Sequence, residues 1–342
     1  MASIQEIAAS VFTPAWIAGQ RKDLPILASS STCTGGIYIV TGANVGLGFE
    51  TAKHLVTFGA AKVIIAVRNT SAGEAAKAKI ESETLKTGVL DVWAIDLSSF
   101  ASVQAFAKRA SDELERVDAV VENAAVALDE WSVSEGHERT ITVNVLGTLL
   151  LGILLFPVLV ESGKQFGIAP RLVFTASEAS WTVKKEWEEI QDAPLKKLDE
   201  QTGDAQQMLR RYALSKLIQT LTIRHLASVL PVAQTGVIIN YVNPGVCKTE
   251  LSRNYKGDYR SFADYCFSEY GRTAEMGSRT ILHGVVAGKD SHGCYLSACE
   301  IREQEVPGWV TDEEGQKGQN RVWDDVIGVL DAVVPGCLDK LL

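Results

Sequence analysis

A tyrosine and a lysine stand one helical turn apart in the stretch RRYALSKLIQTL, residues 210–221. Apolar residues recur there every three or four positions, a pattern typical of a helix that buries one face. Tyr212 and Lys216 are four residues apart, so both side chains leave the helix on the same face. A free tyrosine has a pKa of about 10, and a neighbouring ammonium favours its phenolate form. The pair therefore predicts a general acid/base that works near neutral pH.

A second candidate site follows the first predicted strand, where the sequence reads TGANVGLGFETAKHL. Gly42, Gly46 and Gly48 fall in the turn between that strand and a helix. Glycine leaves room for a tight turn and for the close approach of a pyrophosphate. The start of the helix directs free N–H groups and its positive dipole end at the phosphates. The structural alternative is a plain glycine-rich turn, but the position in the first strand–helix unit favours a dinucleotide site.

Arg68 and Asn69 directly follow the second predicted strand. A dinucleotide site needs a group here that faces the adenosine ribose, and an acidic residue would accept a hydrogen bond from the 2′-hydroxyl of NAD. Arg68 can instead pair with a 2′-phosphate in a fork geometry. The arginine therefore predicts NADP(H) rather than NAD(H), and its alternative interpretation is a solvated surface residue.

The spacing TGxxxGxG at residues 41–48 and the YxxxK motif at 212–216 resemble the short-chain dehydrogenase/reductase family. The resemblance spans roughly residues 36–300. It is strongest to the subgroup of retinol-dehydrogenase-like and protochlorophyllide-reductase-like enzymes, which have short motifs similar to residues 41–48 and 67–69. It implies a reductase that passes a hydride between NADP(H) and a carbonyl or alcohol.

The resemblance also implies roles for particular residues. Tyr212 would protonate the substrate oxygen, and Lys216 would bind the nicotinamide ribose. Ser177, at the end of the strand in RLVFTASEAS, would orient the substrate oxygen, with Ser180 and Thr175 as rivals. Asn144 would kink its helix and hold a water that passes protons to Lys216.

The implied cofactor contacts come from the glycine turn, the ends of the following strands and the loop NPGVCKT. They are Gly42, Asn44, Val45, Gly46, Leu47, Gly48, Arg68, Asn69, Asp96, Leu97, Asn123, Ala124, Tyr212, Lys216, Pro244, Gly245, Val246 and Thr249. The family usually has NNAG after its fourth strand, whereas this chain has ENAA at residues 122–125. Glu122 and Ala125 therefore put the local turn in doubt.

Apolar, β-rich runs alternate with helical patterns from residue 36 onward. The predicted strands are 36–41, 62–67, 89–95, 117–122, 171–176, 236–242 and 293–297, and the predicted helices lie near 47–58, 70–86, 99–115, 137–161, 206–230 and 273–288. Continuous apolar strands suit a parallel sheet buried on both faces. The pattern predicts the α/β class, with a single Rossmann-type doubly wound parallel sheet of about seven strands flanked by helices.

The remaining segments lie outside this minimal plan. Residues 1–34 are expected to form an N-terminal extension that drapes over the body or is partly mobile. Residues 35–342 would form one reductase domain, with insertions at about 178–207 and 248–272. These insertions carry aromatic side chains toward the expected pocket, a lining that suits a bulky, largely apolar small molecule such as a secondary metabolite. The aromatic residues are Trp181, Trp187, Tyr255, Tyr259, Phe262, Tyr265 and Phe267.

Composition narrows the class of protein further. The formal charge of −9 over 342 residues argues against a nucleic-acid surface. The six cysteines show no metal-ligand spacing, so we expect no metal and reduced thiols in a cytoplasmic protein. No basic start precedes an apolar run at the N-terminus, so we expect no signal peptide.

The apolar run at 145–160 is shorter than a bilayer span and is interrupted by Pro157, which favours a buried helix over a transmembrane segment. That helix could pair with its copy in a homodimer, or the N-terminal extension could mask it. Two other functions stay open: a catalytically silent NADP-binding regulator, and an isomerase or dehydratase on the same fold. The intact set of Asn144, Ser177, Tyr212 and Lys216 argues against the silent regulator.

Overall fold

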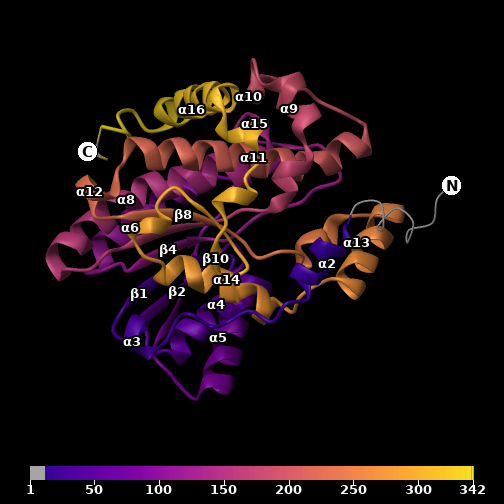
Figure 1. Cartoon of the computed structure of the whole chain (residues 1–342). Helices are drawn as coiled ribbons and strands as arrows, with labels where there is room; N and C mark the ends of the chain where they lie inside the picture. Colours follow the sequence, from indigo (N-terminus) through magenta and orange to yellow (C-terminus); the bar gives the residue numbers. More distant parts are fainter. Residues whose placement is uncertain (1–11, 340, 342) are drawn as a thin grey trace.

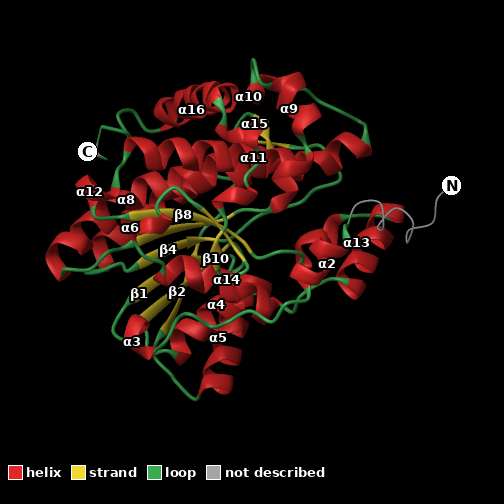
Figure 2. Ribbon diagram, viewed as in Figure 1, coloured by secondary structure: helices red, strands yellow, loops and turns green. Residues whose placement is uncertain are grey.

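An eight-stranded sheet forms the centre of the computed structural model, which describes residues 12–339 and Leu341 (Figure 2). Its strand order is β10-β9-β8-β7-β4-β1-β2-β3. The strands are β1 (Ile37–Thr41), β2 (Lys62–Val67), β3 (Leu90–Ala94), β4 (Ala119–Glu122), β7 (Arg171–Thr175), β8 (Ile238–Asn243), β9 (Tyr295–Ser297) and β10 (Glu300–Ile301). All neighbours pair in parallel except β10, which pairs antiparallel with β9. The predicted fold class is confirmed, with the two-residue β10 as an unpredicted addition.

Helices cover both faces of the sheet and create two apolar cores (Figure 1). One face carries α4 (Gly46–Thr57), α5 (Thr70–Thr84) and α14 (Ala274–Val286), and the other carries α6 (Phe100–Glu113), α8 (Thr148–Phe166) and α11 (Ala205–Val229). Because both faces are covered, β8 is buried along its whole length. Because the strands are parallel, their carboxyl ends lie at one edge of the sheet, where ligands bind in folds of this kind.

The predicted helix over 137–161 is built from three pieces. A short α7 (Arg139–Ile141) runs into a π-helical segment, η1 (Thr142–Gly147), and then into α8. The continuous stretch Arg139–Phe166 is long and apolar enough to cross a membrane, but 78% of its most apolar window is buried inside the protein. The burial agrees with the prediction of a core helix.

The C-terminal part of the chain adds a helix that the sequence interpretation missed. After α15 (Gly308–Thr311), α16 (Glu313–Val333) packs against α11. Val322, Val326 and Leu330 are buried on its inner face. Their spacing of four residues is a helical signal that could have revealed it.

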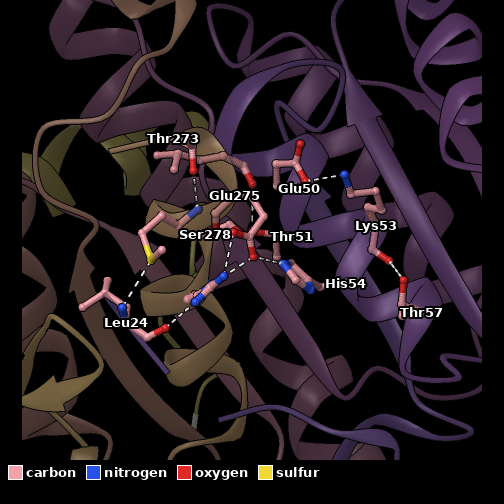
Figure 3. A network of polar contacts seen from close by, with 12 residues as sticks. Leu24, Glu50, Thr51, Lys53, His54, Thr57, Thr273, Glu275 and Ser278 are labelled. Carbon is pink, nitrogen blue, oxygen red and sulfur yellow. Dashed lines mark hydrogen bonds and ion pairs between the residues drawn. The ribbon is translucent and has the colours of Figure 1, made fainter. Parts of the chain in front are cut away.

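The described part of the N-terminal extension lies along α14 and α13 (Gly257–Glu269), rather than over α8 (Figure 1). It contains α2 (Pro14–Gln20) and α3 (Ser30–Cys33). The Leu24 N–H donates to Met276 Sδ at 3.2 Å, and Arg279 donates to the Leu24 main-chain oxygen. Arg279 also pairs with Glu275, which contacts His54 Nε2 of α4 at 2.9 Å (Figure 3). The extension is thus joined through α14 to the helix that follows the glycine turn.

The two predicted insertions are largely helical. Residues 178–207 include η2 (Glu178–Thr182), α9 (Lys184–Ile190), α10 (Pro194–Leu198) and the start of α11, and residues 248–272 include η3 (Glu250–Asn254) and α13. Smaller elements complete the described chain: β5 (Val133–Ser134), β6 (His137–Glu138), α12 (Val232–Thr235), η4 (Lys289–Ser291) and η5 (Glu303–Glu305).

Candidate active site

A cavity of about 1660 Å³ lies at the carboxyl ends of the parallel strands. It is lined by most of the residues that the sequence predicted for the site: Gly42, Asn44, Val45, Gly46, Leu47, Arg68, Asn69, Asp96, Leu97, Asn123, Ala124, Ser177, Tyr212, Lys216, Pro244, Gly245, Val246 and Thr249. Two predicted residues, Gly48 and Asn144, are not part of its wall. One cavity therefore joins the predicted nucleotide cradle to the predicted catalytic pair.

The glycine turn has the geometry of an anion cradle. Gly42 adopts a φ of +67°, a backbone conformation that is unfavourable for any residue with a side chain. A Cβ on Gly48 would lie 2.6 Å from Asn123 Nδ2 and 2.7 Å from the Gly42 oxygen, so only glycine lets α4 start this close to the sheet. No side chain caps the first turn of α4 at Val45. The N–H groups of that turn are therefore available for a phosphate.

The ENAA turn is formed despite its departure from the family pattern. The Thr41 hydroxyl accepts from the Asn123 and Ala124 N–H groups at 2.9 and 3.0 Å, and Asn123 Nδ2 donates to the Thr41 main-chain oxygen at 2.9 Å. Ala125 keeps a negative φ, so glycine is not required there. Glu122 and Ala125, the two departures from the family pattern, therefore leave the turn intact.

Glu122 is the unusual member of this turn because it is fully buried on β4. Neither carboxyl oxygen has a hydrogen-bond partner of good geometry among the described residues. The Thr41 hydroxyl lies nearby but donates to the Val121 oxygen. Burial raises the pKa of Glu122 well above its ordinary value, and Thr41 offsets only part of this effect. Burial thus favours the neutral form of this carboxyl group.

Arg68 and Asn69 lie where β2 meets α5. Asn69 caps α5 by accepting from the Ala72 N–H at 3.2 Å. Arg68 is exposed and forms no hydrogen bond or ion pair with any residue that the structure describes. Its guanidinium is therefore free to meet an anion at the N-terminal end of α5.

Burial shifts the protonation of both members of the tyrosine–lysine pair. It raises the pKa of Tyr212 well above the ordinary value, an effect that the Ser177 side chain partly offsets. It lowers the pKa of Lys216 to about 7. The other groups that act on Tyr212 are Tyr255 and Cys247, and both raise its pKa. The expected lowering of the tyrosine pKa by Lys216 is thus not found in the protein alone.

The structure separates Ser177 from Ser180 but not from Thr175, which also lines the cavity. The Ser177 side chain lines the cavity and lowers the pKa of Tyr212. Its hydroxyl also caps the start of η2 by accepting from the Ala179 N–H at 3.2 Å. Ser180 is completely buried away from the cavity. The main-chain oxygen of Thr175 accepts from Lys216 Nζ at 2.7 Å.

Asn144 lies in the π-helical segment with its side chain fully engaged. Its Oδ1 accepts from the Val126 N–H at 2.9 Å, and its Nδ2 donates to the Val126 oxygen and to Ser215 Oγ. Its main-chain oxygen accepts from Gln219 Nε2 at 2.8 Å. The main-chain oxygen of Asn144 is thus joined through Gln219 to Lys216, whose Nζ donates to Gln219 Oε1 at 3.1 Å.

Two residues missed from the sequence hold the 244–246 turn. Arg272 is buried and donates to the oxygens of Pro244 and Gly19, both at 2.9 Å. Gln20 donates to the Val246 oxygen and, at 3.1 Å, to the Tyr270 oxygen. Neither position carries a local signal, because both act on backbone that is more than twenty residues away.

The outer cavity is aromatic, in part as predicted. Trp181, Tyr255, Tyr259, Phe262 and Phe267 line it, whereas Tyr265 does not. The prediction was wrong for Trp187, which packs in the core beside Gly318 of α16. Phe12 and Trp16 of the extension also line the cavity, and Trp16 Nε1 donates to Glu178 Oε1 at 3.1 Å.

Known proteins resemble the chain in both sequence and fold. Residues 37–187 match the model of the short chain dehydrogenase family. A short chain dehydrogenase/reductase of Cryptosporiopsis sp. (strain 8999) is 37% identical over 92% of this chain and 96% of its own length. A short chain dehydrogenase of Emericella nidulans is 38% identical over 78% of this chain and 85% of its own.

Solved structures agree on the fold. A short chain dehydrogenase from Shigella flexneri complexed with NADP has a TM-score of 0.55 at 23% identity, covering 80% of this chain and 100% of its own. A 3-ketoacyl-(acyl-carrier-protein) reductase from Brucella melitensis complexed with NADH has a TM-score of 0.56 at 21% identity, covering 78% of this chain and 97% of its own. On this sequence similarity and this fold, the chain belongs to the short-chain dehydrogenase/reductase family of oxidoreductases.

Proposed function

We propose that the protein is an NADPH-dependent reductase of the carbonyl group of a bulky, largely apolar small molecule, with a secondary metabolite as the leading candidate. The observation that carries this proposal is the single cavity that joins the uncapped α4 turn, the free Arg68 and the Ser177–Tyr212–Lys216 group. Reverse oxidation of the alcohol uses the same groups.

The cofactor fits the donor set of this chain. The N–H groups at the start of α4 suit the pyrophosphate, and Arg68 suits a 2′-phosphate better than a ribose hydroxyl. Pro244, Gly245, Val246 and Thr249 would face the nicotinamide end, and Asp96 and Leu97 the adenine. The bound nicotinamide would supply the hydride. NADP in the Shigella protein is in keeping with this choice, whereas the Brucella protein shows that the same fold also takes NADH.

The catalytic step requires a proton donor beside the reacting carbonyl. Tyr212, kept protonated by its raised pKa, is suited to protonate the substrate oxygen. Ser177 would hydrogen-bond the same oxygen and stabilise the charge that develops on it. Lys216 lines the cavity with an ammonium that titrates near neutrality, so it can both bind the cofactor ribose and favour the Tyr212 phenolate after proton transfer.

The substrate class rests on the outer cavity. Its aromatic wall, with Trp16, Trp181, Tyr259 and Phe262, suits a large ring system. A cytoplasmic location and a homodimer formed through α8 stay predictions, as does the division into an extension and one domain.

The decisive experiment follows NADPH oxidation with a panel of bulky ketones, aldehydes and quinones, in the wild type and in Tyr212→Phe. We expect turnover in the wild type, a loss of roughly 100-fold or more in Tyr212→Phe, and equal NADPH affinity in both. Tight NADPH binding without turnover on any substrate would favour the silent regulator. Conversion of a substrate with no net NADPH oxidation would favour the isomerase or dehydratase.

A further inference from the structure

A buried chain of hydrogen bonds runs inward from the candidate catalytic lysine. Lys216 Nζ donates to the Thr175 main-chain oxygen at 2.7 Å and to Gln219 Oε1 at 3.1 Å. Gln219 Nε2 then donates to the main-chain oxygen of Asn144 at 2.8 Å. Lys216, Gln219 and Asn144 are 2%, 1% and 0% exposed, so this chain is shielded from solvent.

The neighbours of Gln219 fix the orientation of its amide. An ammonium can only donate, so the amide oxygen must face Lys216, and a carbonyl can only accept, so the amide nitrogen must face Asn144. Two of the three Lys216 N–H donors are thereby used on the protein side. The third is left for the cavity, which Lys216 lines.

We propose that Gln219 is a positioning residue: its amide bridges Lys216 Nζ and the main-chain oxygen of Asn144, and so aims the lysine at the cofactor. The inference rests on the proposed reductase function.

The hydrogen bond to Gln219 should also set the protonation of Lys216. An acceptor stabilises the ammonium against burial, which already lowers the pKa of this lysine to about 7. Burial is the one cause of the lowered Lys216 pKa. The ionisable groups that act on the neighbouring Tyr212 are Cys247 after β8 and Tyr255 after η3. Burial raises the pKa of Cys247 and of Tyr255 to about 12, so neither titrates near neutrality.

The test compares pH profiles of carbonyl reduction and of NADPH affinity in the wild type, Gln219→Met, Gln219→Glu and Thr220→Val. Gln219→Met keeps the length but removes the acceptor, so we expect roughly tenfold lower kcat/KM and an alkaline limb that moves to lower pH. Gln219→Glu places a carboxylate beside Lys216 and should move that limb to higher pH. Thr220→Val is the matched control, because Thr220 is buried on the same helix and its hydroxyl has no partner among the described residues.

Opposite shifts in the Met and Glu variants, with Thr220→Val unchanged, would support the proposal. A uniform loss at every pH would show a purely structural role, and profiles equal to the wild type would also overturn it. If Gln219→Glu fails to fold, Gln219→Met still tests the proposal through its own pH profile. Its NADPH affinity can be measured even where its turnover is low. Failure of the proposed function would instead appear in the wild type itself, as an absence of NADPH binding and of carbonyl reduction.

Discussion

The guanidinium of Arg272 donates to the main-chain oxygen of Gln20 at 3.0 Å, across 252 residues of sequence. The same guanidinium holds Pro244, and the Gln20 amide holds Val246. The N-terminal extension is therefore joined to the turn that is expected to face the nicotinamide. A Cβ on Gly245 would lie 2.5 Å from Gln20 Oε1, which shows how closely the two segments pack.

We expect Gln20→Ala to weaken NADPH binding several-fold and to lower the melting temperature. The substitution leaves the Val246 and Tyr270 oxygens without their side-chain donor, and each lost hydrogen bond costs about 1 kcal/mol. NADPH titration and thermal unfolding measure the two effects. Gln104→Ala, at an exposed position of α6, should change neither. Equal NADPH affinity in Gln20→Ala and the wild type would show that the turn keeps its shape without the Gln20 amide.

Arg68→Ala should weaken NADPH binding by roughly 10- to 100-fold, because a charge-assisted contact to a phosphate is worth about 1.5–3 kcal/mol. NADH lacks the 2′-phosphate, so its affinity should stay nearly unchanged. Titrations that follow nicotinamide fluorescence with both cofactors give the ratio directly. If both affinities fall equally, Arg68 supports the site in general rather than selecting NADPH.

Glu122 should make the protein less stable as the pH rises. In the unfolded chain this carboxyl loses its proton near its ordinary pKa of 4.5, whereas in the folded protein it keeps the proton to higher pH. Within that window the folded state binds more protons, so the free energy of unfolding falls as pH increases. Glu122→Gln removes the ionisation and should flatten this slope.

Melting temperatures of the wild type and Glu122→Gln over a pH series from 4.5 upward test this effect. Glu115→Gln, at an exposed position before β4, is the control and should keep the wild-type slope. If the slope persists in Glu122→Gln, another buried group causes it.

The parts of the site carried by local sequence could be predicted, and those made by distant contacts could not. The glycine turn and the Tyr212–Lys216 pair depend on spacing within one strand–turn–helix unit or one helix, so the sequence shows them directly. Gln20, Arg272 and Gln219 act through contacts to backbone elsewhere in the fold, which spacing does not reveal. The sequence predicts Trp187 in the pocket because nothing in its own segment shows that α16 returns to cover it.

Gly147→Ala should destabilise the protein through a contact that also borders the site. A Cβ at this position in the π-helical segment would lie 2.1 Å from the main-chain oxygen of Leu97, in the strand-end loop expected to contact the adenine. Because backbone meets backbone there, η1 and the loop must move apart, at a cost of about 1–3 kcal/mol. Gly328→Ala on α16 meets nothing within 4 Å and should instead stabilise by about 0.5–1 kcal/mol through helix propensity. Chemical denaturation of both variants gives the sign of each change in the free energy of unfolding. Asn144 lies in the same π-helical turn, so Gly147→Ala should also lower turnover. If Gly147→Ala is as stable as the wild type, η1 can move away from Leu97 without loss of stability. The close contact between Gly147 and Leu97 would then not be needed to position Asn144.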